Sequence, residues 1–169
     1  MNLTKTWEDC VKRLEGLNLR KDEVYIGHSG GKDSCLVHRL TIDSGYNLPI
    51  VHSSKNPGSH NGVHPRTMEF LYDLSTKFPI IFCPLESLSS LPYIFQLDGT
   101  RADEAERSDG RSTDLVFNGE VINRANMGLI NPKGLGNKKF IYPLFDLDTE
   151  TVWSLIKFLN VPVSKEYNE

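Results

Sequence analysis

The chain has 169 residues, of which 38% are hydrophobic and 24% are charged. This length suits one ordinary domain, residues 1–169, and the composition is that of a globular protein rather than a disordered one. The 19 basic and 22 acidic side chains give a formal charge of −3, and no run of lysine or arginine is longer than two residues. A duplex nucleic acid partner is therefore not expected, because it needs a basic surface.

The apolar segments are too short to cross a membrane. Residues 78–85 form one of the longest, which is far below the roughly 20 residues of a membrane span. Residues 1–12 also lack the apolar core of a secretory signal. We therefore expect a cytoplasmic protein without a membrane partner. Its three cysteines, Cys10, Cys35 and Cys83, form no CxxC pair, so a disulfide framework is not expected.

The first half of the chain alternates between helix and strand patterns. Apolar spacing predicts a first helix over residues 3–17, with Thr6 as a capping residue. Short β-rich runs and helical stripes then follow one another, bounded by glycine and proline. The predicted strands are 24–27, 49–52 and 80–83, and the predicted helices are 32–44 and 65–78. This order predicts an α/β fold with a doubly wound, mostly parallel sheet and helices on both faces.

The second half is less regular. Residues 98–119 are polar and rich in arginine, aspartate, glutamate and serine, which predicts a loop or lid. Residues 140–144 predict a returning strand. Asp148 or Thr149 is expected to cap a closing helix, whose apolar face runs from Val152 to Leu159.

The most specific signal is the hexapeptide SGGKDS at residues 29–34, between a predicted strand and a predicted helix. Its glycines permit a tight turn, and backbone N–H groups at a helix N-terminus favour phosphate oxygens. Lys32 adds a positive charge, and Ser29 and Ser34 add hydroxyl donors. The pattern is not a Walker A loop, because Ile26 stands at the first glycine of that motif and Asp33 follows the lysine. It predicts a polyphosphate site.

SGGKDS resembles the pyrophosphate-binding loop of the PP-loop ATP pyrophosphatase superfamily, whose fold is Rossmann-like and of the adenine nucleotide α-hydrolase type. Residues 99–107, GTRADEAER, resemble the GxRxxExxR segment of the branch that holds phosphoadenosine phosphosulfate reductase and the ATP sulfurylase small subunit. Residues 142–153 resemble a further region of that branch through Pro143, Asp146 and Trp153. The three segments stand in the family order.

The resemblance implies cleavage of ATP between its α- and β-phosphates, adenylation of an acceptor and release of pyrophosphate. It implies Lys32, Asp33, Arg101 and Arg107 as catalytic residues, and Asp33 as the residue that shares Mg²⁺ with the pyrophosphate. The expected contacts to the nucleotide come from the loop and from two residues outside it. They are Ser29, Gly30, Gly31, Lys32, Asp33, Ser34, His52 and Glu104.

Two arginines six residues apart, Arg101 and Arg107, are expected to clamp a small anionic or nucleobase-type acceptor, with Glu104 orienting one of them. The alternative is that these charges form a solvated, salt-bridged face. Residues 121–126 either reach the acceptor or form a turn.

Sulfonucleotide reductases carry a nucleophilic cysteine in a C-terminal motif, and this sequence holds no cysteine after Cys83. Two alternatives to adenylation therefore stay open. One is a phosphosulfate reductase-like protein whose thiol is supplied in trans, and the other is a non-catalytic adenine-nucleotide-binding subunit. A homo-oligomer or a partner subunit could complete the pocket.

The other residues with reactive side chains are expected to have structural rather than chemical roles. His52, His60, His64 and Cys83 are of the types that bind zinc, but loop histidines are more often solvated, so zinc is not expected. Cys35 stands in the first turn of a predicted helix, where a thiolate is favoured. Burial as a small apolar residue is the stronger expectation.

Overall fold

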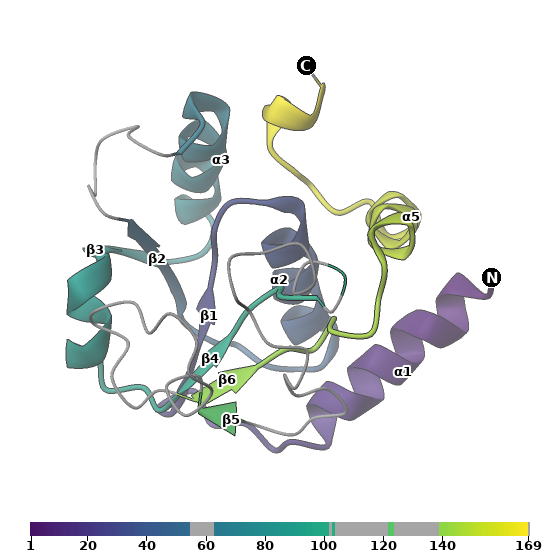
Figure 1. Ribbon diagram of the computed structural model, residues 1–169, viewed down its shortest axis with the longest axis horizontal. Helices are drawn as coiled ribbons and strands as arrows, with labels where there is room; N and C mark the ends of the chain where they lie inside the picture. Colours follow the sequence, from purple (N-terminus) through teal and green to yellow (C-terminus); the bar gives the residue numbers. More distant parts are fainter. Residues whose placement is uncertain (55–62, 102, 104–121, 124–138, 169) are drawn as a thin grey trace.

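The structure is a computed structural model that describes residues 1–54, 63–101, 103, 122–123 and 139–168 (Figure 1). Its elements alternate between helices and strands from α1 to β4. In chain order they are α1 (Leu3–Glu15), β1 (Val24–Gly27), α2 (Lys32–Asp43), β2 (Ile50–Ser54), α3 (Pro65–Ser75), β3 (Ile80–Pro84), the 3₁₀-helix η1 (Leu85–Ser90), β4 (Phe95–Leu97), β5 (Ile122–Asn123), β6 (Lys139–Ile141), α5 (Thr149–Leu159) and the 3₁₀-helix η3 (Lys165–Asn168).

The described strands form one sheet in the order β3-β2-β1-β4-β6-β5. All neighbouring pairs are parallel except β5 and β6. The chain runs outward from β1 through β2 to β3, and then returns to place β4 on the other side of β1. The predicted doubly wound, mostly parallel α/β fold is confirmed. Its switch point lies between β1 and β4, where Ile26 of β1 is in register with Leu97 of β4.

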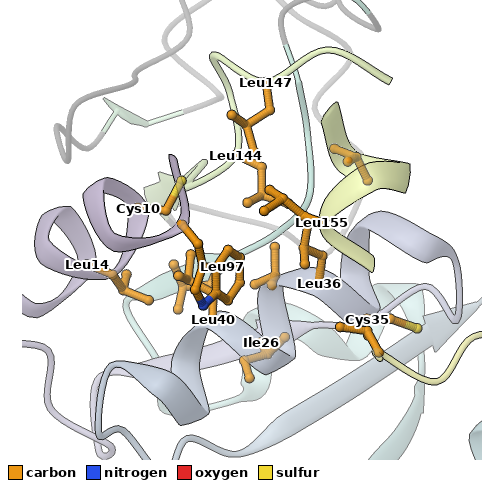
Figure 2. Packing of buried hydrophobic residues seen from close by; sticks show 14 of the residues in the cluster. Cys10, Leu14, Ile26, Cys35, Leu36, Leu40, Leu97, Leu144, Leu147 and Leu155 are labelled. Carbon is orange, nitrogen blue, oxygen red and sulfur yellow. The ribbon is translucent and has the colours of Figure 1, made fainter. Parts of the chain in front are cut away.

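Two clusters of buried apolar side chains lie on the two faces of the sheet. The larger cluster joins α1, α2 and α5 to the sheet, and Phe70 of α3 packs against it. Figure 2 shows its centre, where Leu36 and Leu40 of α2 lie near Leu97 of β4. The smaller cluster includes Tyr25 and is covered by η1 and by the segment after β6. Among the described residues, the second face is therefore covered by a 3₁₀-helix rather than by an α-helix.

Polar caps fix where the helices begin. The Asn2 side chain accepts a hydrogen bond from the Lys5 N–H at 3.0 Å, so α1 starts at Leu3 and the prediction of Thr6 as a cap is wrong. The prediction for α5 is confirmed, since Asp148 accepts from the Thr151 N–H at 2.7 Å. Such caps satisfy N–H groups that have no partner inside the helix.

The largest difference from the predicted elements is β4, a strand of three residues that the sequence pattern did not indicate. It lies in the middle of the sheet, between β1 and β6. Residues 104–119 of the predicted lid lie outside the described residues. Within the described part of the chain, no helix has the length and apolar character needed to cross a membrane.

Candidate functional site

The SGGKDS segment lies at the switch point of the sheet. Residues 29–31 connect the carboxyl end of β1 to the first turn of α2, and β4 ends beside them. A Cβ built on Gly99, just after β4, would lie 2.6 Å from the Cβ of Asp33. Residues from both strand ends therefore meet in one place. Open α/β sheets bind their ligands at this position.

Gly30 is required by both conformation and space. Its φ angle is +85°, which side chains rarely adopt, and an added Cβ would lie 2.3 Å from Cγ2 of Thr67 in α3. The absence of a side chain thus lets the loop pass close to α3.

Three backbone N–H groups of the loop donate to acceptors close by in the sequence. The Ser29 N–H donates to Oγ of Ser34 at 3.1 Å, and the Gly31 N–H donates to Oγ of Ser29 at 3.2 Å. The Gly30 N–H donates to Nδ1 of His28 at 3.0 Å. These bonds hold the loop in shape. In this conformation the backbone N–H groups of Ser29, Gly30 and Gly31 serve the loop itself rather than a ligand.

The first turn of α2 supplies the remaining donors. The Lys32 N–H donates to Oη of Tyr167 at 2.9 Å. Among the described residues, no acceptor faces the N–H groups of Asp33 and Ser34, which have no partner inside the helix. Nζ of Lys32 lies 5.8 Å from the ring centroid of Trp153. The anion-binding capacity of the segment therefore resides in this turn.

Arg101 is the largest fully buried side chain among the residues that the structure describes. Its Nε lies 2.9 Å from Oδ1 of Asp33, and its Nη1 lies 2.8 Å from the carboxylate of Asp103 and 3.1 Å from Oγ1 of Thr149. The second oxygen of Asp33 lies 3.2 Å from Nζ of Lys32. Arg101 thus joins the segment after β4 to the starts of α2 and α5. Its guanidinium pairs with two carboxylates of the protein, and the expectation that it clamps an acceptor stays a prediction.

Glu104 and Arg107 lie outside the described residues. His52 is described. Its side chain is buried in β2, and Nδ1 donates to the His28 carbonyl at 2.8 Å. This bond ties β2 to the end of β1, and the expected contact of His52 to a nucleotide stays a prediction.

His28 is a residue of the site that the sequence did not single out. Burial lowers its pKa to about 3, helped by the neighbouring His38 and His52. The imidazole is therefore neutral at neutral pH, and because Nδ1 accepts from Gly30, its proton lies on Nε2. The signal in the sequence was a histidine directly before the SGGKDS loop.

Cys35 is buried in the first turns of α2, and burial raises the pKa of its thiol to about 12. The expectation of a buried, apolar role is confirmed. Of the four zinc-type residues, His60 lies outside the described residues. Among the residues that are described, no three histidine, cysteine, aspartate or glutamate side chains are placed to hold a metal ion.

Asp98 is a second carboxylate at the switch point that the sequence reasoning missed. It is half-buried at the end of β4 and accepts from the Thr100 N–H at 3.0 Å and from Nε2 of Gln96 at 3.2 Å. Oε1 of Gln96 in turn accepts from the hydroxyl of Tyr25. Asp98 therefore rests on neutral donors, and within the described part of the chain it has no ion pair.

No protein-family model and no curated protein matches the sequence. Solved structures do match the fold. NMN synthetase from Francisella tularensis is 16% identical with a TM-score of 0.60, and the match covers 96% of this chain and 72% of that one. Phosphoadenylyl-sulfate (PAPS) reductase from Candida auris, in a phosphate complex, is 10% identical with a TM-score of 0.63, with 94% and 82% covered.

NH₃-dependent NAD synthetase from Campylobacter jejuni, in complex with nitrate, is 18% identical with a TM-score of 0.50, and 95% of this chain and 75% of that one are covered. All three enzymes belong to one superfamily, and it is the one that the SGGKDS loop resembles. The chain therefore has the fold of the PP-loop ATP pyrophosphatases.

Proposed function

We propose that this protein binds MgATP at the switch point between β1 and β4, cleaves it between the α- and β-phosphates, and transfers the adenylyl group to an acceptor. One observation carries the proposal. The SGGKDS loop lies at the carboxyl end of β1 and opens α2, in a fold shared with NMN synthetase and PAPS reductase. The PAPS reductase structure is a phosphate complex, which supports an anion site in this fold.

In the proposed reaction an atom of the acceptor attacks the α-phosphorus. A bond forms between them, the bond from the α-phosphorus to the bridging oxygen breaks, and pyrophosphate leaves with that electron pair. Such a step depends on positioning and on electrostatic stabilisation more than on a covalent protein group. We assign the stabilisation to the N–H groups of Asp33 and Ser34, the positive end of α2 and the ammonium group of Lys32.

The residues present fit a magnesium ion that is carried by the nucleotide. Mg²⁺ is usually held by one or two carboxylates together with substrate phosphates, and it offsets the negative charge of those phosphates. Oδ1 of Asp33 is held by Arg101 at 2.9 Å, while Oδ2 faces Lys32 at 3.2 Å. We assign Oδ2 as the ligand, with Lys32 turning to the phosphates when the nucleotide is bound.

The acceptor that we propose is a small anionic or nucleobase-type molecule. We assign Arg101 to holding the carboxylate of Asp33 in place. Arg107 and Glu104 remain our candidates for direct contact. A second copy of the chain or a partner subunit is proposed to complete this side of the pocket.

Isothermal titration calorimetry with MgATP tests the nucleotide site. We expect Lys32→Ala to weaken binding at least tenfold, because the variant loses a charge beside the phosphates. Lys5→Ala is the matched control, since Lys5 also pairs with an aspartate, Asp9 at 2.9 Å, but lies on α1. The proposed site would be wrong if the unaltered protein did not bind MgATP, or if both variants bound MgATP equally well.

Pyrophosphate release in the presence of oxyanion and nucleobase-type acceptors tests the chemistry. We expect release to fall at least tenfold in Asp33→Ala and in Lys32→Ala. Binding of MgATP without turnover of any acceptor would instead identify a nucleotide-binding subunit. Sulfite formed from phosphoadenosine phosphosulfate and reduced thioredoxin would identify a reductase.

A further inference from the structure

The segment that follows α5 returns to the SGGKDS loop. Figure 1 shows η3 beyond α5, on the side of α3. Oγ1 of Thr67 in α3 donates to Oε1 of Glu166 at 2.7 Å. Ser164 is 1% exposed, and its Oγ accepts from the Glu166 N–H at 3.3 Å. Several contacts thus fix this segment beside the loop.

Tyr167 is the residue of this segment that reaches α2. Its hydroxyl accepts from the Lys32 N–H at 2.9 Å, and its ring meets the ring of Trp153 edge-on at a centroid distance of 5.0 Å. A Cβ on Gly31 would lie 3.3 Å from this hydroxyl, a tight contact. Gly31 therefore makes room for Tyr167 at the positive end of α2.

The hydroxyl of Tyr167 can donate a further hydrogen bond. A tyrosine hydroxyl accepts hydrogen bonds and donates one, and the hydrogen of Tyr167 has no acceptor among the described residues. Burial raises the pKa of Tyr167, so the group stays protonated at neutral pH. It carries no charge that would repel an anion. By accepting from the helix N-terminus it becomes a stronger donor, because hydrogen bonds in a chain polarise one another.

We propose that Tyr167 is a binding residue of the pyrophosphate site: its hydroxyl donates to a phosphate oxygen while it accepts from the Lys32 N–H. The inference rests on the proposed function and adds a donor from a segment far from the loop in sequence. The hydroxyl joins the N–H groups of Asp33 and Ser34 in a set of three neutral donors. Lys32 supplies the full charge.

The anchoring contacts favour a hydroxyl that stays in place over one that an incoming anion displaces. Turning Tyr167 aside would break its edge contact with Trp153, and moving the whole segment would also break the bond between Thr67 and Glu166. An anion that binds beside the hydroxyl keeps both. If the hydroxyl stays and binds the anion, its removal weakens anion binding. If the anion displaces the hydroxyl, its removal strengthens anion binding.

Calorimetry with inorganic pyrophosphate on the full chain shows whether removal of the hydroxyl weakens or strengthens binding. We expect Tyr167→Phe to raise the dissociation constant about tenfold, because a hydrogen bond to a charged group is lost. Tyr72→Phe is the matched control, since Tyr72 is 45% exposed on α3 and packs on Phe82. Urea denaturation of each variant checks that the fold is kept.

A second variant, Thr67→Val, loosens the anchor without touching the hydroxyl. We expect a smaller loss of affinity, and little further loss when it is combined with Tyr167→Phe, because both changes act through one contact. Unchanged or tighter binding by Tyr167→Phe overturns the inference and leaves the proposed function standing. Absence of pyrophosphate binding by the unaltered protein overturns both.

Discussion

The two segments that meet at the switch point are held in shape by different forces. The backbone of residues 28–31, after β1, is held by hydrogen bonds between neutral groups, such as Gly30 to His28 and Ser29 to Ser34. Residues 98–103, after β4, are held by ions, with Arg101 between Asp33 and Asp103. The turn before α2 thus keeps its shape without charged partners. Lys32 and Asp33 at the start of α2 form an ion pair at 3.2 Å, which opens when Lys32 turns to the phosphates.

The segment after β4 is more sensitive to the loss of one partner. A buried charge is costly to remove from water, and the cost is offset only while all of its partners are present. Neutral hydrogen bonds carry a smaller penalty when one is lost. We therefore expect substitutions after β4 to change the free energy of unfolding over a wider range than substitutions in the turn after β1.

The largest effect is expected for Arg101→Met, which keeps the apolar stem and removes the guanidinium. Asp33 and Asp103 then lose their shared partner. We expect the free energy of unfolding to fall by about 3–5 kcal/mol, measured by urea denaturation.

Arg20→Met is the control for this change, since Arg20 pairs with Asp22 at 2.9 Å on the surface. Exposed pairs contribute about 0–1 kcal/mol. Equal effects of the two substitutions would show that the ions at the switch point do not hold the segment.

A smaller effect is expected from His28, on the other side of the switch point, and it depends on pH. Burial lowers the pKa of His28 to about 3, whereas the unfolded chain titrates near 6.5. Between these values the unfolded state binds more protons, so stability falls as the pH falls below about 6.5. From His28 alone, we expect a loss of about 2 kcal/mol at pH 5.

His28→Asn isolates this contribution. Asparagine keeps an acceptor for the Gly30 N–H but does not titrate, so the variant should lose less stability than the unaltered protein between pH 7 and pH 5. Urea denaturation of both proteins at the two pH values measures the difference. His38, whose pKa burial also lowers, is present in both proteins and cancels. Parallel pH dependence of the two would contradict a neutral His28.

The parts of the site that depend on neighbours in the sequence could be predicted, and the parts that depend on distant neighbours could not. The glycines and hydroxyls of residues 29–34 and the cap at Asp148 act on groups within a few residues. Besides Asp103, Arg101 binds partners from α2 and from the start of α5, and no spacing pattern indicates these two. The sequence therefore suggested an arginine that clamps an acceptor or lies on a solvated face, and not a buried one.

Two further features could not be predicted, one because a strand is short and the other because two residues lie far apart in the sequence. β4 has three residues, too few for a periodic pattern of apolar side chains, so Asp98 at its end was not seen as a strand-end residue. Tyr167 lies 135 positions from Lys32. The packing of η3 against α3 and the contact with Trp153 bring it to the loop.

The smallest effect is expected where a carboxylate has no ionic partner. Asp98→Asn keeps an oxygen for the Thr100 N–H but turns the bond from Gln96 into a meeting of two donors. We expect a loss of about 1 kcal/mol, the value of one neutral hydrogen bond. Asp33→Asn is the matched comparison, and it should cost about 2–3 kcal/mol, because a bond to the buried charge of Arg101 is weakened. Urea denaturation of the two variants compares a carboxylate held by ions with one held by neutral donors. If Asp98→Asn proved as costly as Asp33→Asn, charge would not be what distinguishes these two carboxylates of the switch point.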